Sequence, residues 1–262
     1  MVRPKTEISQ LEAVSDAVSR GTLYHGQPMG FIRSINGVQT YYVFPPGGSM
    51  ENAILLFTDA MGIHFEKNRL LADNFAANGY FTVMPDLFRG DCVPFDRPKD
   101  WSQTLWYKNH LPATVKPIIV DVVAEMRKYG ARRIAGVGYS IGAKYLTRFM
   151  KEATICVAYV AHPAWVEEED ILAIDRPISI AFGGDGCVTP AQREKIEMLL
   201  SESGLHYQIN LYSDVPHGFA VRHPAGHKYN KFVKEQAFLQ AIQWLNFYMK
   251  RGGNTWARSP WS

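Results

Sequence analysis

Hydrophobic positions along the chain alternate between short unbroken runs and stripes at helical spacing. Residues 53–58 form a continuous apolar run, which is typical of a strand buried on both faces of a sheet. Residues 67–78 then predict a helix that ends at Gly79, with an apolar stripe made of Leu70, Leu71, Phe75 and Ala76. The same alternation of strand and helix continues to the end of the chain.

Further strands are predicted at residues 80–84, 133–137, 155–160, 178–182 and 207–212, and further helices at 115–129, 143–151 and 231–250. Another helix begins at Thr189, because Thr189, Pro190 and Gln192 form a capping box with proline at the first helical position. Asn36-Gly37 between two β-favouring runs predicts a hairpin over residues 31–44.

This order predicts an α/β fold: a mainly parallel sheet, with helices on both faces and an antiparallel N-terminal hairpin. No repeat or linker-like segment divides the chain, so one domain is expected over residues 1–262. The tail at 252–262 is rich in Gly, Ser and Trp, and we expect it to be mobile.

Residues 86–114 interrupt the alternation with prolines, charges, Trp101, Trp106 and Tyr107. A connection this long inside a compact domain usually carries function. Two interpretations fit the aromatic residues: a lid-like insertion over a flat substrate, or rings that pack the segment onto the body. We prefer the lid.

Composition narrows the class of protein. The chain has 262 residues, 47% of them hydrophobic, and a formal net charge of +3 with scattered basic residues, which favours neither a nucleic-acid nor a membrane partner. The three cysteines are too widely spaced for a metal pair, and no signal peptide or membrane-length apolar run is recognised. We therefore expect a cytoplasmic protein, monomeric or homodimeric, that acts on a small molecule.

The motif Gly138-Tyr-Ser-Ile-Gly142 lies between a predicted strand and a predicted helix. This is the arrangement of a nucleophile elbow, in which flanking glycines allow a turn so tight that it lifts the Ser140 hydroxyl above the sheet. The helix N-terminus also supplies backbone N–H groups, and the N–H of Ile141 is the predicted oxyanion donor.

A serine nucleophile needs a base and an orienting acid, which follow it in this order in the α/β-hydrolase fold. Asp185 and His217 each follow a predicted strand, so they are expected at the same sheet edge as Ser140. Asp59-Ala-Met-Gly62 follows the strand at 53–58; Ala60 is the candidate for the second oxyanion donor, and Asp59 for a contact with the serine or a substrate hydroxyl. His162 also follows a strand at this edge, either lining the pocket or serving a structural role. A loose dinucleotide-binding glycine pattern overlaps the elbow but lacks a ribose-binding acid at the next strand end.

The sequence resembles the dienelactone hydrolase family of α/β-hydrolases, in its fungal branch, from about Gly26 to the last helix. The stretches that carry the resemblance are His25-Gly-Gln-Pro-Met-Gly30, Thr58-Asp-Ala-Met-Gly62, Arg69-Leu-Leu-Ala-Asp73, Gly79-Tyr-Phe-Thr-Val-Met-Pro-Asp86, Gly138-Tyr-Ser-Ile-Gly142, Ala161-His-Pro163 and His217-Gly-Phe219. The founding members carry cysteine and glutamate where this chain has Ser140 and Asp59. The resemblance also implies substrate-binding arginines, for which Arg89 and Arg222 lie near the matching places.

The residues and the resemblance together predict a serine hydrolase without cofactor or metal, acting on an ester or lactone of an aromatic or polyketide-type metabolite. The predicted substrate contacts are Asp59, Arg89, Trp101, Trp106, His162 and Arg222. Two other functions fit the same residues: a lyase, isomerase or cyclase that uses His217 as base, or a silent relative that only binds a small molecule.

Overall fold

The computed structural model describes residues 26–94, 96–184, 187–222 and 227–250. Its centre is one eight-stranded sheet in the order β1-β2-β4-β3-β5-β6-β7-β8. The strands are β1 (Phe31–Ile35), β2 (Val38–Val43), β3 (Asn52–Phe57), β4 (Phe81–Pro85), β5 (Arg133–Tyr139), β6 (Val157–Ala161), β7 (Ile178–Gly183) and β8 (Tyr207–Tyr212). Strands β1 and β2 pair antiparallel, as do β2 and β4, and all other neighbours are parallel. The predicted sheet is therefore confirmed, and the chain has the α/β-hydrolase arrangement.

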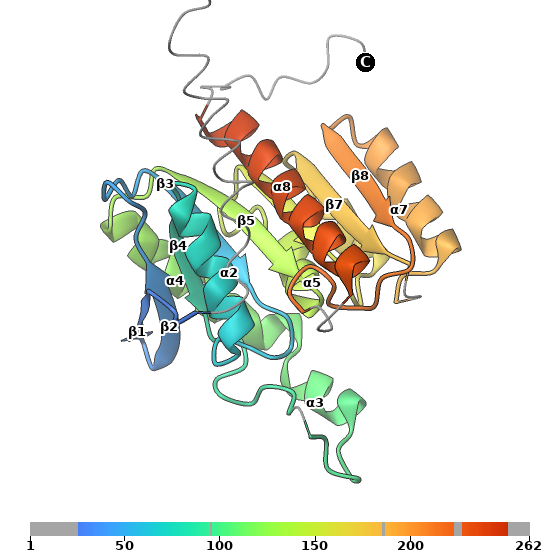
Figure 1. Cartoon of the computed structure of the whole chain (residues 1–262), viewed down its shortest axis with the longest axis horizontal. Helices are drawn as coiled ribbons and strands as arrows, with labels where there is room; N and C mark the ends of the chain where they lie inside the picture. The colour runs from blue at the N-terminus through green and yellow to red at the C-terminus, as the bar shows by residue number, and fades with distance from the viewer. Residues whose placement is uncertain (1–25, 95, 185–186, 223–226, 251–262) are drawn as a thin grey trace, which may run out of the picture.

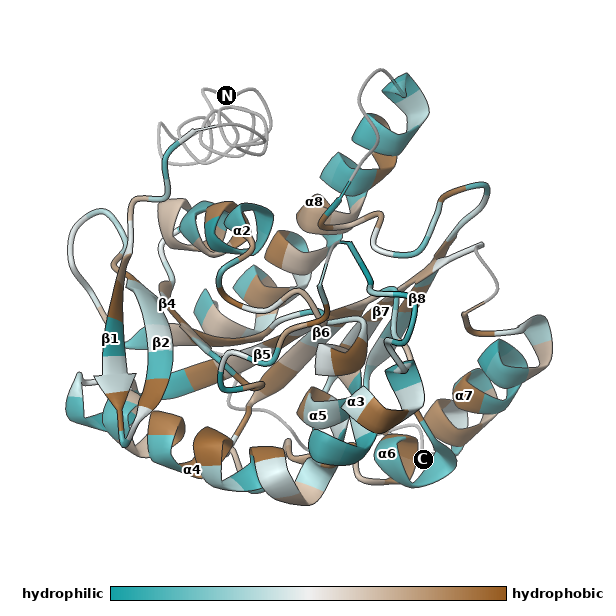
Figure 2. Cartoon of the chain, turned by 90° about the horizontal axis from the view of Figure 1, so that it is seen from below, coloured by the Kyte–Doolittle hydropathy of each residue, from teal (hydrophilic) through white to brown (hydrophobic). Residues whose placement is uncertain are grey.

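Helices cover both faces of the sheet (Figure 1). The helices are α2 (Glu66–Ala77), α3 (Gln103–Asn109), α4 (Pro112–Lys128), α5 (Ile141–Arg148), α6 (Glu168–Leu172), α7 (Pro190–Glu202) and α8 (Lys228–Lys250). Figure 2 shows α2 and α8 on one side of the sheet, and α4, α5 and α7 on the other.

The apolar run of β3 explains this layering. Leu55 and Phe57 face the cluster that includes α4 and α5, whereas Ile54 and Leu56 face the cluster that includes α2 and α8. Because side chains alternate along a strand, only a strand covered on both faces has hydrophobic residues at every position.

Two local predictions are confirmed in detail. Asn36 and Gly37 both have positive φ, at 47° and 80°, as the two-residue hairpin between β1 and β2 requires. Thr189 accepts the Gln192 N–H, the Gln192 side chain accepts the Thr189 N–H, and α7 begins at Pro190.

The long connection after β4 contains a helix that its hydrophobic pattern does not predict. Helix α3 begins after Ser102, whose hydroxyl accepts the Leu105 N–H. The next helix, α4, begins at Pro112 rather than at residue 115. The N-terminal residues 1–25 and the tail beyond residue 250 lie outside the described residues, so the expectation about the tail stays a prediction.

Candidate active site

The sheet topology selects one edge for a site. Strand β4 lies on one side of β3, while β5 lies on the other, so the direction of winding changes at β3. Ligand sites of α/β sheets lie outside the carboxyl ends of the strands at such a switch point. Asp59 follows β3 and Ser140 follows β5, so both residues lie at this point.

Ser140 occupies a tight turn between β5 and α5. Its φ and ψ are 55° and −120°, a strained conformation for a residue with a side chain. A Cβ at Gly142 would overlap the Phe57 carbonyl oxygen, and a Cβ at Gly138 would lie 2.9 Å from the Ala143 Cα. The two glycines of the motif are therefore required by main chain that approaches them closely.

The hydroxyl of Ser140 lies 2.8 Å from Nε2 of His217, which follows β8. This is hydrogen-bond distance, and it brings together two residues 77 positions apart in the sequence. Asp185 lies outside the described residues, so its predicted role in orienting His217 stays a prediction.

The backbone around Ser140 provides two candidate oxyanion donors. Ile141 is the first residue of α5, where an N–H has no acceptor within the helix. The Asp59 carbonyl accepts the Gly62 N–H at 3.1 Å. Because the carbonyl and the next N–H point in opposite directions across a trans peptide, this bond fixes the direction of the Ala60 N–H.

Asp59 is buried and held from several sides. Its Oδ1 accepts hydrogen bonds from the Asn68 Nδ2 at 2.9 Å and from the Met61 N–H at 3.1 Å. Its Oδ2 lies 3.8 Å from Nε of Arg222, so the arginine balances the buried carboxylate. Asn68 is a supporting residue that the sequence interpretation missed, although a polar residue on the inner face of α2 was a visible signal.

His162 is buried, and neither ring nitrogen has a hydrogen-bond partner among the described residues. Its ring packs edge-on against His217, with centroids 5.0 Å apart. Burial lowers the pKa of His162 well below its usual range, and His217 and Arg222 lower it further. The ring is therefore neutral near pH 7.

The three predicted substrate contacts in the connection after β4 differ in how deeply they are buried. Trp106 is only 4% exposed and lies in the hydrophobic core cluster with α4 and α5, so it packs the segment onto the body, the second of the two interpretations; its indole N–H donates to the Asp91 carbonyl of the same segment at 2.6 Å. Trp101 is half-buried beneath the guanidinium of Arg97, 4.9 Å from its ring centroid. Arg89 is exposed, with φ 52°, in the turn after β4.

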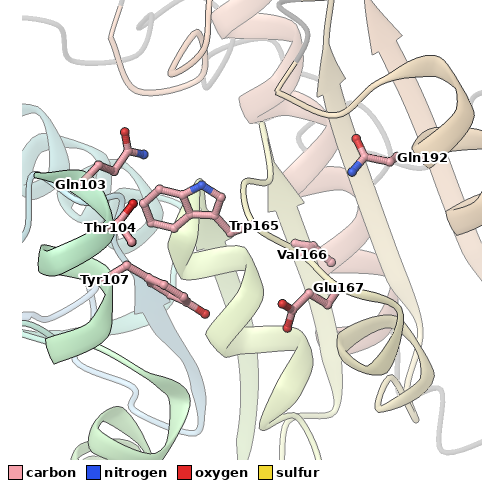
Figure 3. A pocket seen from close by; sticks show the side chains of 7 residues that line it. All are labelled: Gln103, Thr104, Tyr107, Trp165, Val166, Glu167 and Gln192. Carbon is pink, nitrogen blue, oxygen red and sulfur yellow. The ribbon is translucent and has the colours of Figure 1, made fainter.

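A cavity of about 550 Å³ opens between α3, the segment after β6 and the first turn of α7, and we call it the Trp165 cavity. It is lined by Gln103, Thr104, Tyr107, Trp165, Val166, Glu167 and Gln192 (Figure 3). The sequence interpretation missed all of these except Tyr107, although the position of Trp165, shortly after Ala161-His-Pro163, placed it near the active edge.

Lys144 on α5 connects the elbow helix to this cavity. Its side chain is only 1% exposed, and its ammonium donates to the Trp165 carbonyl at 2.9 Å, to Glu167 at 2.7 Å and to Asp170 at 2.9 Å. Burial opposes the charge, but the hydrogen bonds to Glu167 and Asp170 outweigh it and raise the pKa of Lys144. Lys144 was also missed; its signal was a lysine one helical turn after the motif serine.

The described residues offer little chemistry outside this site. No cluster of three metal-ligating side chains occurs within the described part of the chain, and no described helix is long and apolar enough to cross a membrane. Burial, with Asp86, Asp59 and Asp91 nearby, raises the pKa of the Cys92 thiol to about 12, so this cysteine is not a thiolate at neutral pH.

Comparison with known proteins gives the family of the chain. The chain is 40% identical to "Hydrolase pyvD" of Aspergillus violaceofuscus over 233 residues, covering 88% of this chain and 95% of that protein. It is 39% identical to "Hydrolase tropI" of Talaromyces stipitatus, covering 88% and 95%, and 29% identical to "Dienlactone hydrolase 1" of Gibberella moniliformis, covering 88% and 93%.

A solved structure of a putative dienelactone hydrolase from Klebsiella pneumoniae has the same fold, with a TM-score of 0.70 at 15% identity, covering 84% of this chain and 99% of that one. A profile of the dienelactone hydrolase family matches residues 38–249. The protein therefore belongs to the dienelactone hydrolase family, as the sequence resemblance predicts, and is a hydrolase with the α/β-hydrolase fold.

Proposed function

We propose that the protein is a cytoplasmic serine hydrolase that cleaves an ester or lactone of a small aromatic metabolite through an acyl-enzyme. The observation that carries this proposal is the 2.8 Å contact between Ser140 Oγ and His217 Nε2 at a strained strand-to-helix turn. A serine hydroxyl becomes an effective nucleophile when an imidazole accepts its proton in this way.

The reaction begins when Ser140 attacks the substrate carbonyl and His217 accepts the hydroxyl proton. The N–H groups of Ile141 and Ala60 stabilise the oxyanion that forms. His217 then donates the proton to the leaving oxygen, and a water molecule, deprotonated by His217, releases the acid from Ser140. In this scheme Asp185 holds the His217 tautomer that accepts the serine proton.

Five of the predicted substrate contacts are proposed to touch the substrate, and the sixth, Trp106, is proposed to act through a neighbouring ring. Asp59 and Arg222 face each other beside the elbow, and neutral His162 lies behind His217. Arg89 and Trp101 lie in the connection after β4, while Trp106 reaches a substrate only through Trp165, whose ring centroid is 6.3 Å away.

The Ser140→Ala variant tests the proposal. We expect hydrolysis of 4-nitrophenyl acetate to fall about 10³-fold or more with an unchanged melting temperature, because the nucleophile is removed and only one oxygen atom is lost. Activity within about tenfold of wild type would refute the role of Ser140.

A fluorophosphonate probe separates the alternatives. A serine hydrolase is labelled at Ser140 and releases acid from esters. A binding protein is not labelled, and a lyase or isomerase is labelled without releasing acid from any ester in a panel.

A further inference from the structure

We infer that the substrate carries an uncharged, hydroxylated aromatic ring, and that this ring binds in the Trp165 cavity. The inference rests on the proposed function, because it describes the substrate of that same site. Four properties of the cavity support it: its position, its aromatic wall, its charge balance and its polar groups.

One wall of the cavity is linked to the main chain of the proposed nucleophile, while Ser140 itself does not line the cavity. The Ala164 N–H donates to the Ser140 carbonyl at 3.2 Å, and Trp165 follows directly in the chain. The volume of about 550 Å³ falls within the range of small-molecule sites. The proposed substrate therefore extends from this cavity to Ser140, with its ring at Trp165 and its ester group at the nucleophile.

Trp165 and Tyr107 form an aromatic wall. Their ring centroids lie 5.1 Å apart at 52°, so the two rings are in contact, and Figure 3 shows them next to each other on one side of the cavity. Trp165 has φ 56° and remains 36% exposed, although Lys144 holds its carbonyl. A large aromatic side chain kept in a strained conformation and open to the cavity is available to stack on a ligand ring.

The charges that line the cavity are already balanced. Glu167 is paired with Lys144 at 2.7 Å and approaches Arg148 at 3.7 Å. No lysine or arginine is among the residues that line the Trp165 cavity. A ligand anion would lose its hydration without gaining a cation, and a ligand cation would compete with Lys144 for Glu167, so both are disfavoured.

Three uncharged polar side chains, Gln103, Thr104 and Gln192, line the same space. Amide and hydroxyl groups both donate and accept hydrogen bonds, as phenolic hydroxyls do. The cavity therefore fits a ring that carries hydroxyl groups better than an unsubstituted one.

A second cavity of about 400 Å³ shares Trp165, Val166, Glu167 and Gln192 with the first. Its other lining includes the apolar side chains of Ile171, Val188, Ile196 and Leu199. Its own charged pair, Lys195 and Glu168, lies at 3.6 Å and is likewise balanced. This second cavity fits an aliphatic substituent on the ring.

Calorimetric titration of the full-length Ser140→Ala variant tests the inference, since binding is then measured without turnover. The probes are methyl 3,5-dihydroxybenzoate, which is neutral, and the 3,5-dihydroxybenzoate anion, which has the same ring with a charge. We expect the ester to bind at least about tenfold more tightly than the anion, because the cavity supplies no cation.

Trp165→Ala, added to Ser140→Ala, is expected to weaken binding of the ester about tenfold, whereas Trp165→Phe keeps a ring and restores most of the affinity. Phe247→Ala is the matched control, because Phe247 is an exposed aromatic residue on α8, 54% accessible and not part of either cavity.

Equal or tighter binding of the anion, or equal effects of Trp165→Ala and Phe247→Ala, would overturn the inference. The proposed function has a separate readout. If the wild type cleaves 4-nitrophenyl acetate while the ester probe does not bind the Ser140→Ala variant, the inference fails and the proposed function stands. If the probe binds as expected and the wild type cleaves no ester, the proposed function fails.

Discussion

Replacing Lys144 by methionine removes the charge at the centre of a buried ion cluster. Lys144 and Asp170 are 1% and 0% exposed, and Asp170 also accepts hydrogen bonds from Arg148 Nε and from the Glu167 N–H. Removing one partner of a buried pair costs about 3–5 kcal/mol. Because Asp170 keeps its ion pair with Arg148, we expect a loss at the lower end of this range, so that the free energy of unfolding falls by about 3 kcal/mol.

Equilibrium unfolding in urea at pH 7, followed by circular dichroism, measures this loss. For a chain of 262 residues a loss of this size lowers the melting temperature by about 6–12 °C. The matched control is Lys116→Met, because Lys116 and Glu152 form an exposed pair at 3.2 Å, and its loss is expected to be below about 1 kcal/mol.

The sign of the pH dependence gives a second check. The pKa of Lys144 is raised in the folded protein, so its stabilisation is fully present below the unfolded value of 10.5 and is lost as the pH rises through the folded value. The difference between wild type and Lys144→Met should therefore shrink in strong alkali. Equal stabilities at pH 7 would show that Arg148 alone compensates Asp170, and the reasoning would be wrong.

Three further predictions concern the site. Asp185→Asn should lower kcat steeply with little change in KM for 4-nitrophenyl acetate, since it disfavours the productive tautomer of His217. If kcat of Asp185→Asn is close to that of the wild type while Asp59→Asn is inactive, Asp59 is the residue that orients His217. His162→Gln should flatten the fall in melting temperature below about pH 6.5, because the unfolded histidine takes up a proton that the buried ring resists. Trp106→Ala should lower the melting temperature and slow all esters alike, whereas Trp101→Ala should slow only bulky aromatic esters if the lid proposal holds.

Features set by neighbouring residues were predictable from the sequence. The hairpin at Asn36-Gly37 and the capping box at Thr189 depend on residues at most three positions apart, and both are confirmed. Helices α3 and α6 were missed because they are only 7 and 5 residues long. The contacts of α6 with Lys144 and Arg148 come from a distant segment and leave no periodic signal.

The candidate site likewise has one part that was predictable from the sequence and one part that was not. The approach of Ser140 and His217 was predictable, because residues that follow parallel strands meet at one edge of the sheet. The Trp165 cavity was not, since its walls come from α3, from the segment after β6 and from α7. Their meeting depends on packing between helices rather than on any local pattern.

The glycines of the elbow have a consequence for how this enzyme can change over evolutionary time. The atoms that exclude a side chain at Gly138 and Gly142 belong to main chain, which has no alternative rotamers to adopt. The Trp165 cavity, in contrast, is lined by several side chains outside the ion cluster of Lys144, namely those of Gln103, Thr104, Tyr107 and Val166. Divergence toward new substrates is therefore expected to accumulate at residues 103, 104, 107 and 166, while the pentapeptide 138–142 keeps its glycines.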